Sequence, residues 1–83
     1  MAADTLNFKK VSKVIGIKQS LKAVEKGNAL KVYLAENADS RMISPLQQAC
    51  EARAVSVVDG YTMDELGSAC GIDVGAAAVA ILK

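Results

Sequence analysis

The apolar residues of this chain change their spacing repeatedly, and this alternation constrains the fold more than any other feature. Stretches with apolar residues three or four positions apart, typical of helices, alternate with short apolar or β-branched stretches that are typical of strands. Because the chain has only 83 residues, every element must be short. The alternation predicts a single α/β domain over residues 1–83, a three-layer α/β/α sandwich with a mixed sheet of about four strands.

The first residues predict a short helix that Asp4 or Thr5 can cap. Its apolar contacts are expected from Leu6, Phe8 and Val11. The same segment lacks a basic stretch followed by a hydrophobic run, so we expect no signal peptide. The cytoplasm is therefore the expected location.

A second helix is expected to begin at Ile17, where Gly16 follows the extended residues 14–15, and to end at Gly27, a typical carboxy-terminal cap. Two stripes run along it: Ile17, Leu21 and Val24 form the apolar stripe, and Lys18, Lys22 and Lys26 form the basic one. Such a helix buries one side and presents its lysines on another. The alternating residues 30–35 that follow predict a strand.

The middle of the chain predicts a turn over residues 37–40 and then a helix. Ser44 is expected to cap that helix, with Pro45 at its first position and Gln47 reaching back to complete a capping box. These three residue types at this spacing are typical of a helix amino-terminus. The helix is therefore expected to begin at Ser44.

The last part of the chain predicts a strand, a helix and a final strand. The β-branched residues 55–58 predict a strand that a turn at residues 59–60 ends. Thr62 and Glu65 form a second capping box, opening a helix that Gly71 is expected to end. The alanine-rich residues 76–82 predict a buried strand.

Nothing in the sequence predicts a metal, a cofactor, a disulfide or a membrane span. Cys50 and Cys70 are the only cysteines and there is no histidine to complete a zinc set. Each cysteine falls on the apolar side of an expected helix, where a free thiol usually acts as a small hydrophobic residue. Residues 71–82 are largely apolar, but a spanning helix needs about 20 such residues.

Enzymatic chemistry is disfavoured by the residues that the chain lacks. Without histidine there is no ordinary serine or cysteine triad, and a nucleophilic Cys70 would need a lysine as its base. Asp64 and Glu65 are adjacent, so on a helix they point about 100° apart and suit the helix dipole better than a shared proton. Neither a Walker-type loop nor a GxGxxG motif occurs. We expect a protein that is not an enzyme.

The charges of the chain are divided along its length. Residues 9–31 hold seven lysines against Glu25 alone, whereas residues 32–82 hold Arg41 and Arg53 against seven acids. Such a polarised molecule can meet phosphates at one end while its net charge stays near zero. From charge alone, a merely solvated lysine face is an equally good interpretation.

The start of the second helix combines features of an anion site. A glycine directly before a helix leaves backbone N–H groups without partners, at the positive end of the helix dipole. Lys18 and Gln19 carry groups that read base edges, while Lys22 and Lys26 are placed to hold phosphates. A-form RNA hides its major-groove edges, so such a device needs a bent or irregular duplex.

Three segments together resemble a known family. They are GIKQSLKAVEKG at residues 16–27, KVYLAE at residues 31–36 and LGSACGIDV at residues 66–74. In order and spacing they resemble the ribosomal protein L7Ae family of kink-turn RNA binders, above all its short bacterial members. The resemblance runs from about residue 14 to residue 82.

The resemblance implies a helix that enters the widened major groove at tandem sheared G·A pairs beside a three-nucleotide bulge. It places Lys18 and Gln19 against the guanines and Lys22 against the backbone or a base edge, and it packs the apolar loop of residues 71–75 against an unstacked nucleotide. The RNA-binding residues it implies are Gly16, Ile17, Lys18, Gln19, Ser20, Lys22, Lys26, Gly71, Ile72, Asp73 and Val74.

One departure from the family pattern concerns Lys18 and Gln19, where many members have Asn and Glu.

The expected partner is kink-turn RNA, either ribosomal RNA or a structured mRNA element, together with the ribosome itself. A monomer without membrane contact is expected. Two alternatives stay open: a structural ribosomal protein without kink-turn selectivity, and a protein-interaction module that docks through residues 72–75.

Overall fold

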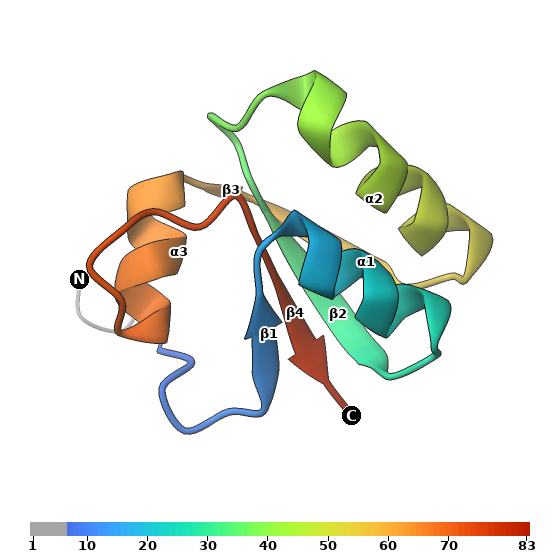
Figure 1. Cartoon of the computed structure of the whole chain (residues 1–83), viewed down its shortest axis with the longest axis horizontal. Coiled ribbons are helices and arrows are strands. Elements are labelled where there is room, and N and C mark those ends of the chain that lie inside the picture. The colour runs from blue at the N-terminus through green and yellow to red at the C-terminus, as the bar shows by residue number, and fades with distance from the viewer. Residues whose placement is uncertain (1–6) are drawn as a thin grey trace.

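The computed structural model describes residues 7–83, which form three helices and one four-stranded sheet (Figure 1). In chain order the elements are β1 (Lys13–Ile15), α1 (Ile17–Glu25), β2 (Ala29–Ala35), α2 (Ser40–Ala52), β3 (Ser56–Tyr61), α3 (Met63–Cys70) and β4 (Ala78–Leu82). In the described part, no helix is both long and apolar enough to cross a membrane.

The sheet has the strand order β1-β4-β2-β3, so the last strand lies in its interior. β4 pairs antiparallel with both β1 and β2, whereas β2 and β3 run parallel and are joined through α2. Two parallel strands need a crossover connection of this kind, because a tight turn makes the second strand antiparallel to the first. The short alanine-rich β4 is buried on both faces, which lets helices approach the sheet closely.

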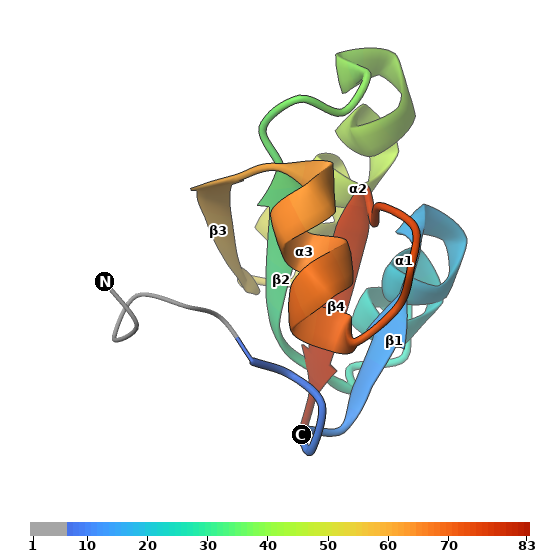
Figure 2. The ribbon, with the colours of Figure 1, turned by 90° about the vertical axis from the view of Figure 1, so that its left-hand side faces the viewer.

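Helices cover both faces of the sheet. Val24 of α1 and Leu46 of α2 pack with Val32 and Ala80 on one face, and Leu66 of α3 packs with Val79 on the other. Figure 2 shows the two helices α1 and α2 on the far side of the sheet from α3. The predicted α/β/α sandwich with a mixed four-stranded sheet is confirmed.

The predicted first helix is wrong over the residues that the structure describes, while Asp4, Thr5 and Leu6 lie outside them. Residues 7–12 form a turn and an irregular segment. Phe8 is buried there, and its amide donates a 2.8 Å hydrogen bond to the carbonyl oxygen of Ala69 in α3. A long-range contact to α3 therefore fixes this segment, and it competes with the local helix.

The predicted start of α2 at Ser44 is also wrong, because the helix begins at Ser40 and contains Pro45. Asp39 is the actual cap: its carboxylate accepts a 2.9 Å hydrogen bond from the Arg41 amide and a 3.2 Å bond from the guanidinium. These two bonds, the side-chain one first, lower the pKa of Asp39. Pro45 removes only the one bond to the Arg41 carbonyl, which a helix of 13 residues tolerates.

The strand expected to end before residues 59–60 continues through them to Tyr61. Tyr33 pairs with Val58 and Ala35 with Tyr61, so β3 holds one residue more than β2 between these pairs. Gly60, with φ of 96°, lies in this bulge. The local signal that predicts a turn thus produces a bulge in an edge strand. β4 begins at Ala78, two residues later than expected.

Other local predictions are confirmed. The side chain of Thr62 accepts from the Glu65 amide and the Glu65 carboxylate accepts from the Thr62 amide, which is the complete capping box of α3. Gly71 ends α3 in the left-handed conformation. Cys50 and Cys70 are free and buried.

Candidate nucleic-acid interface

The amino-terminus of α1 is open. Gly16 precedes it with φ of 100° and ψ of 159°, a region essentially restricted to glycine, and provides no side-chain cap. Its amide donates to the Ala78 carbonyl at 2.8 Å and its carbonyl accepts from the Ser20 amide at 3.0 Å. Within residues 7–83, the amides of residues 17–19 therefore have no acceptor, and the first turn carries no acid. Such an end favours an anion.

Most polar side chains of α1 are exposed. They include Lys18, Gln19 and Lys22, and Lys26, which follows the helix, is exposed as well, whereas Ile17 is half-buried against the core. Ser20 differs from its neighbours: it is fully buried, and its hydroxyl has no hydrogen-bond partner in the described part of the chain. Four of the residues expected at the interface thus reach solvent, and the Ser20 side chain lies beneath them.

The loop between α3 and β4 is held tightly against α3. The Ile72 amide donates to the Gly67 carbonyl at 3.1 Å, and the Ala76 amide donates to the Met63 carbonyl at 3.0 Å. A side chain at Gly67 would overlap the carbonyl oxygen of Val74, so the loop backbone occupies the space above that glycine. Val74 is left 70% exposed at the tip of the loop.

The remaining loop residues divide between core and surface. Ile72 is half-buried against the cluster that contains Phe8 and Leu66. Asp73 and Gly71 are exposed. Burial in the core therefore accounts for the apolar side chain of Ile72, but it does not account for the exposed Val74.

The two expected parts of the interface meet at the start of β4. Ala78 accepts the Gly16 amide, and the preceding Ala77 accepts the Ala35 amide at 2.9 Å. The start of α1 is therefore joined to Ala78, which follows Val74 of the loop by four residues along the chain, at the end of the sheet where β1 and β2 finish (Figure 1). One ligand of nucleic-acid size can touch both segments.

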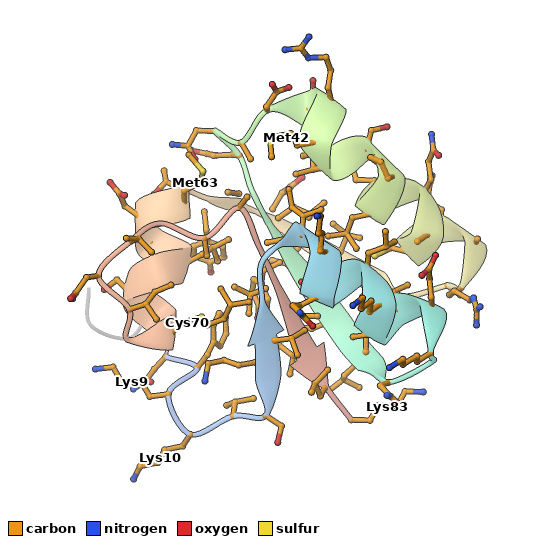
Figure 3. All side chains as sticks on the ribbon, in the orientation of Figure 1. Lys9, Lys10, Met42, Met63, Cys70 and Lys83 are labelled. Carbon is orange, nitrogen blue, oxygen red and sulfur yellow. The ribbon has the colours of Figure 1, made fainter. Side chains whose placement is uncertain are left out.

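Two residues that contact opposite ends of α3 were not singled out from the sequence. The Asn37 side chain accepts a 2.9 Å hydrogen bond from the Met63 amide and so fixes the turn after β2 to the start of α3. The Lys9 side chain packs over Gly71, and with Asp64 and Ser68 it borders a shallow groove along the loop. Figure 3 shows Lys9 at the carboxyl end of α3. Both contacts join segments far apart in sequence, so no local signal predicts them.

The described residues carry little that resembles a catalytic centre. Burial raises the pKa of the Cys70 thiol, and nearby Lys13 offsets this only in part. A thiol with a raised pKa stays protonated at neutral pH and is a poor nucleophile. No group of three metal-binding side chains occurs within residues 7–83. The arrangement is suited to binding an anionic surface.

Comparison with known proteins gives consistent matches. The model of the "Ribosomal protein L7Ae/L30e/S12e/Gadd45 family" matches residues 4–83. The chain is 39% identical over 82 residues to "RNA-binding protein BH0128" of Halalkalibacterium halodurans, covering 94% of this chain and 100% of that protein. It is 36% identical over 83 residues to "Large ribosomal subunit protein eL8" of Halobacterium salinarum, covering 99% of this chain and 65% of the archaeal one.

A solved structure supports the same relationship. The "Giardia lamblia 15.5kD RNA binding protein" superimposes with a TM-score of 0.82 and 32% sequence identity. The match covers 87% of this chain and 61% of that one. The Giardia protein therefore shares most of this fold and extends beyond the matched part.

Proposed function

The chain belongs to the ribosomal protein L7Ae/L30e/S12e/Gadd45 family, and from this premise we propose that it is a kink-turn RNA-binding protein that stabilises a sharp RNA bend without catalysing a reaction. Its target is ribosomal RNA or a structured mRNA element in the cytoplasm. Relatives named RNA-binding protein and the fold shared with the Giardia RNA-binding protein support this proposal.

The observation that carries the proposal is the open amino-terminus of α1 with two exposed base-reading side chains on it. Three amides without acceptors face solvent there, beside the exposed Lys18 and Gln19. Lysine donates to guanine O6 and N7, and the glutamine amide both donates and accepts. The end of this helix therefore offers an anion site and base donors within one turn.

The surroundings fit a bent duplex better than a straight one. A regular A-form major groove is too narrow for a helix end, whereas sheared G·A pairs beside a bulge widen it. A bulged nucleotide leaves the stack, and the exposed Val74 on its rigid loop offers an apolar contact to such a base. Lys22 and Lys26 follow one and two turns later along α1, where the phosphates of the same strand can be neutralised.

The test compares three RNAs of equal length by gel shift or calorimetry at fixed salt: a kink-turn, the same RNA with Watson–Crick pairs in place of the G·A pairs, and a straight duplex. We expect the kink-turn to bind about 100-fold more tightly than the other two. Lys18→Ala with Gln19→Ala should remove most of this preference, since each base contact contributes about 1 to 3 kcal/mol.

The matched control removes one amide and one cation from another part of the surface. Gln48→Ala with Arg53→Ala deletes the exposed amide of Gln48 in α2 and the exposed cation of Arg53, which follows α2, and it should leave the preference for the kink-turn unchanged. Equal affinity of the unaltered protein for all three RNAs would contradict the proposal. That result would favour a structural ribosomal protein without kink-turn selectivity, a role for which the relative named large ribosomal subunit protein eL8 is the precedent.

A further inference from the structure

All three aromatic residues of the chain gather on one face of the sheet. The sequence contains one phenylalanine, two tyrosines and no tryptophan. The ring centroids of Phe8 and Tyr33 lie 4.8 Å apart, and those of Tyr33 and Tyr61 lie 6.1 Å apart. Phe8 is buried, but both tyrosines are only half-buried. The two tyrosine rings thus border the surface.

Residues 7–83 cover this face only in part. α3 packs on β2 and β4, while β3 lies at the edge of the sheet, clear of α3 in Figure 2. The β3 residues that share the face with Tyr33 are the exposed Ser56 and the half-buried Val58. On the opposite face, by contrast, Val32 and Leu34 of β2 are buried under helices. We call the surface of Lys31, Tyr33, Val58 and Tyr61 that residues 7–83 leave uncovered the tyrosine face.

The tyrosine face carries one lysine, Lys31. Ile81 of β4 pairs with Lys31 on one side and with Lys13 on the other, and because Ile81 is buried, Lys13 lies across a covered row from this face. The Lys31 ammonium lies 6.0 Å from the centroid of the Tyr33 ring. Within residues 7–83, neither lysine lies within 4 Å of a carboxylate. The carboxylate of Glu65 in α3 accepts a hydrogen bond from the Thr62 amide.

We propose that the tyrosine face binds a single-stranded RNA segment that flanks the kinked duplex, with bases on the two tyrosine rings and a phosphate at Lys31. This inference rests on the proposed function. Half-exposed aromatic rings on a sheet, with lysines beside them, are the combination that holds single strands in other folds. A second copy of this chain fits less well, because a symmetric contact through this face would set lysines against lysines.

The position of the tyrosine face connects it with the α1 site. Tyr61 ends β3, and its carbonyl accepts the Glu36 amide at 2.8 Å. The amide of the preceding Ala35 donates to the Ala77 carbonyl, and the adjacent Ala78 carbonyl accepts the Gly16 amide. Tyr61 therefore lies at the end of the sheet where α1 begins, and Tyr33 and Lys31 lead away from it along β2. A strand that leaves the duplex can continue over this path.

The test measures the affinity for one kink-turn RNA with and without a short single-stranded pyrimidine extension. The extension should increase the affinity of the unaltered protein about tenfold, the gain expected from one well-stacked base. Tyr33→Leu, which keeps apolar bulk but removes the stacking ring, should abolish this gain, and Lys31→Gln should reduce it about threefold. Arg53→Gln, which removes one exposed cation from the far end of α2, should keep the full gain.

A second measurement needs no variant and so remains decisive if Tyr33→Leu does not fold. Tyr33 and Tyr61 are the only tyrosines, so ring signals in the NMR spectrum of tyrosine-labelled protein report on this face alone. We expect both rings to shift with the extended RNA and not with the blunt one. Unchanged rings and no gain from the extension would overturn the inference, showing that the rings only fill the core or are covered by another part of the chain. Failure of the blunt kink-turn RNA to bind would instead overturn the proposed function.

Discussion

The helices α1 and α3 begin in opposite ways. At α3, Thr62 and Glu65 exchange two hydrogen bonds, the Asn37 side chain takes the Met63 amide, and two acids occupy the first turn. At α1, a glycine replaces the cap, no acid is present, and the amides of residues 17–19 lack acceptors within the described chain. The amides at the start of α3 have partners within the protein, whereas those at the start of α1 are available to a ligand.

This difference separates stability from binding. Capping bonds stabilise a helix by about 1 kcal/mol, so an uncapped end is a cost to the fold. A chain of 83 residues has a small core and little stability to spare. That α1 is left open in such a chain, and that its first turn carries Lys18 and Gln19, supports a role in binding. The variants below separate the two ends, beginning with the largest expected effect.

Charge exchange between the two helix ends should have the largest effect. Lys18→Glu gives α1 an acid in its first turn, as α3 has, and we expect it to weaken kink-turn binding at least 100-fold because a carboxylate then faces phosphates. The reverse change, Asp64→Lys at α3, should leave RNA affinity within about threefold. Titration of labelled RNA at constant salt measures both. A gain in affinity with Asp64→Lys as large as the loss with Lys18→Glu would mean that net charge, and not the position at α1, governs binding.

Gly16→Ala should lower the free energy of unfolding by about 1 to 3 kcal/mol. The φ of 100° and ψ of 159° at Gly16 lie in a region that residues with a Cβ avoid, although open space surrounds the position. The altered start of α1 should also weaken RNA binding. Urea unfolding and the RNA titration check the two effects. Gly27→Ala, at the other end of the helix, is the comparison, with a cost to stability but none to RNA binding.

Thr62→Ala should reduce stability by about 1 kcal/mol, because it breaks the capping box of α3. For a domain of this size the melting temperature should fall by about 4 to 8 °C. RNA affinity, measured well below that temperature, should stay within twofold. A large loss of affinity would show that the closed end of α3 also takes part in binding.

Ser20→Ala should have the smallest effect. The Ser20 hydroxyl is fully buried and has no hydrogen-bond partner among residues 7–83. Its removal should leave stability unchanged or raise it by up to about 1 kcal/mol, since no bond is lost and a desolvated hydroxyl disappears. Thermal melts and the RNA titration check this. A marked loss of affinity would show that the hydroxyl reaches the RNA after a movement of α1.

The sequence predicts those parts of the fold that short-range signals control. The capping box of α3 and the start of α1 at Ile17 follow from residues within one turn of each other, and both are confirmed. The end of α1 was expected at Gly27, but the cap is Lys26, and Gly27 follows it with φ of 77°. The start of α2 was predicted at Ser44 because proline is typical of a first helical position, but the Asp39 cap one turn earlier dominates. The turn expected at Gly60 becomes a bulge, because pairing with β2 continues beyond it.

The candidate site follows the same division. Glycine before a basic helix predicts the exposure of Lys18 and Gln19, since the periodicity of α1 fixes which side is buried. The hydrogen bond from the Met63 amide to the Asn37 side chain and the packing of Lys9 over Gly71 join residues far apart in the chain. The tyrosine face depends in the same way on the pairing of β2 with β3. Only the assembled sheet brings these residues together.

One NMR titration tests the central claim most directly. Protein labelled with ¹⁵N is titrated with kink-turn RNA while the backbone amide signals of both helix starts are followed. The account predicts that the largest shift changes fall on Ile17, Lys18 and Gln19, whose amides are free to receive the RNA, and that those of Asp64 and Glu65 change little. Larger changes at the first turn of α3, with the α1 amides unmoved, would contradict it.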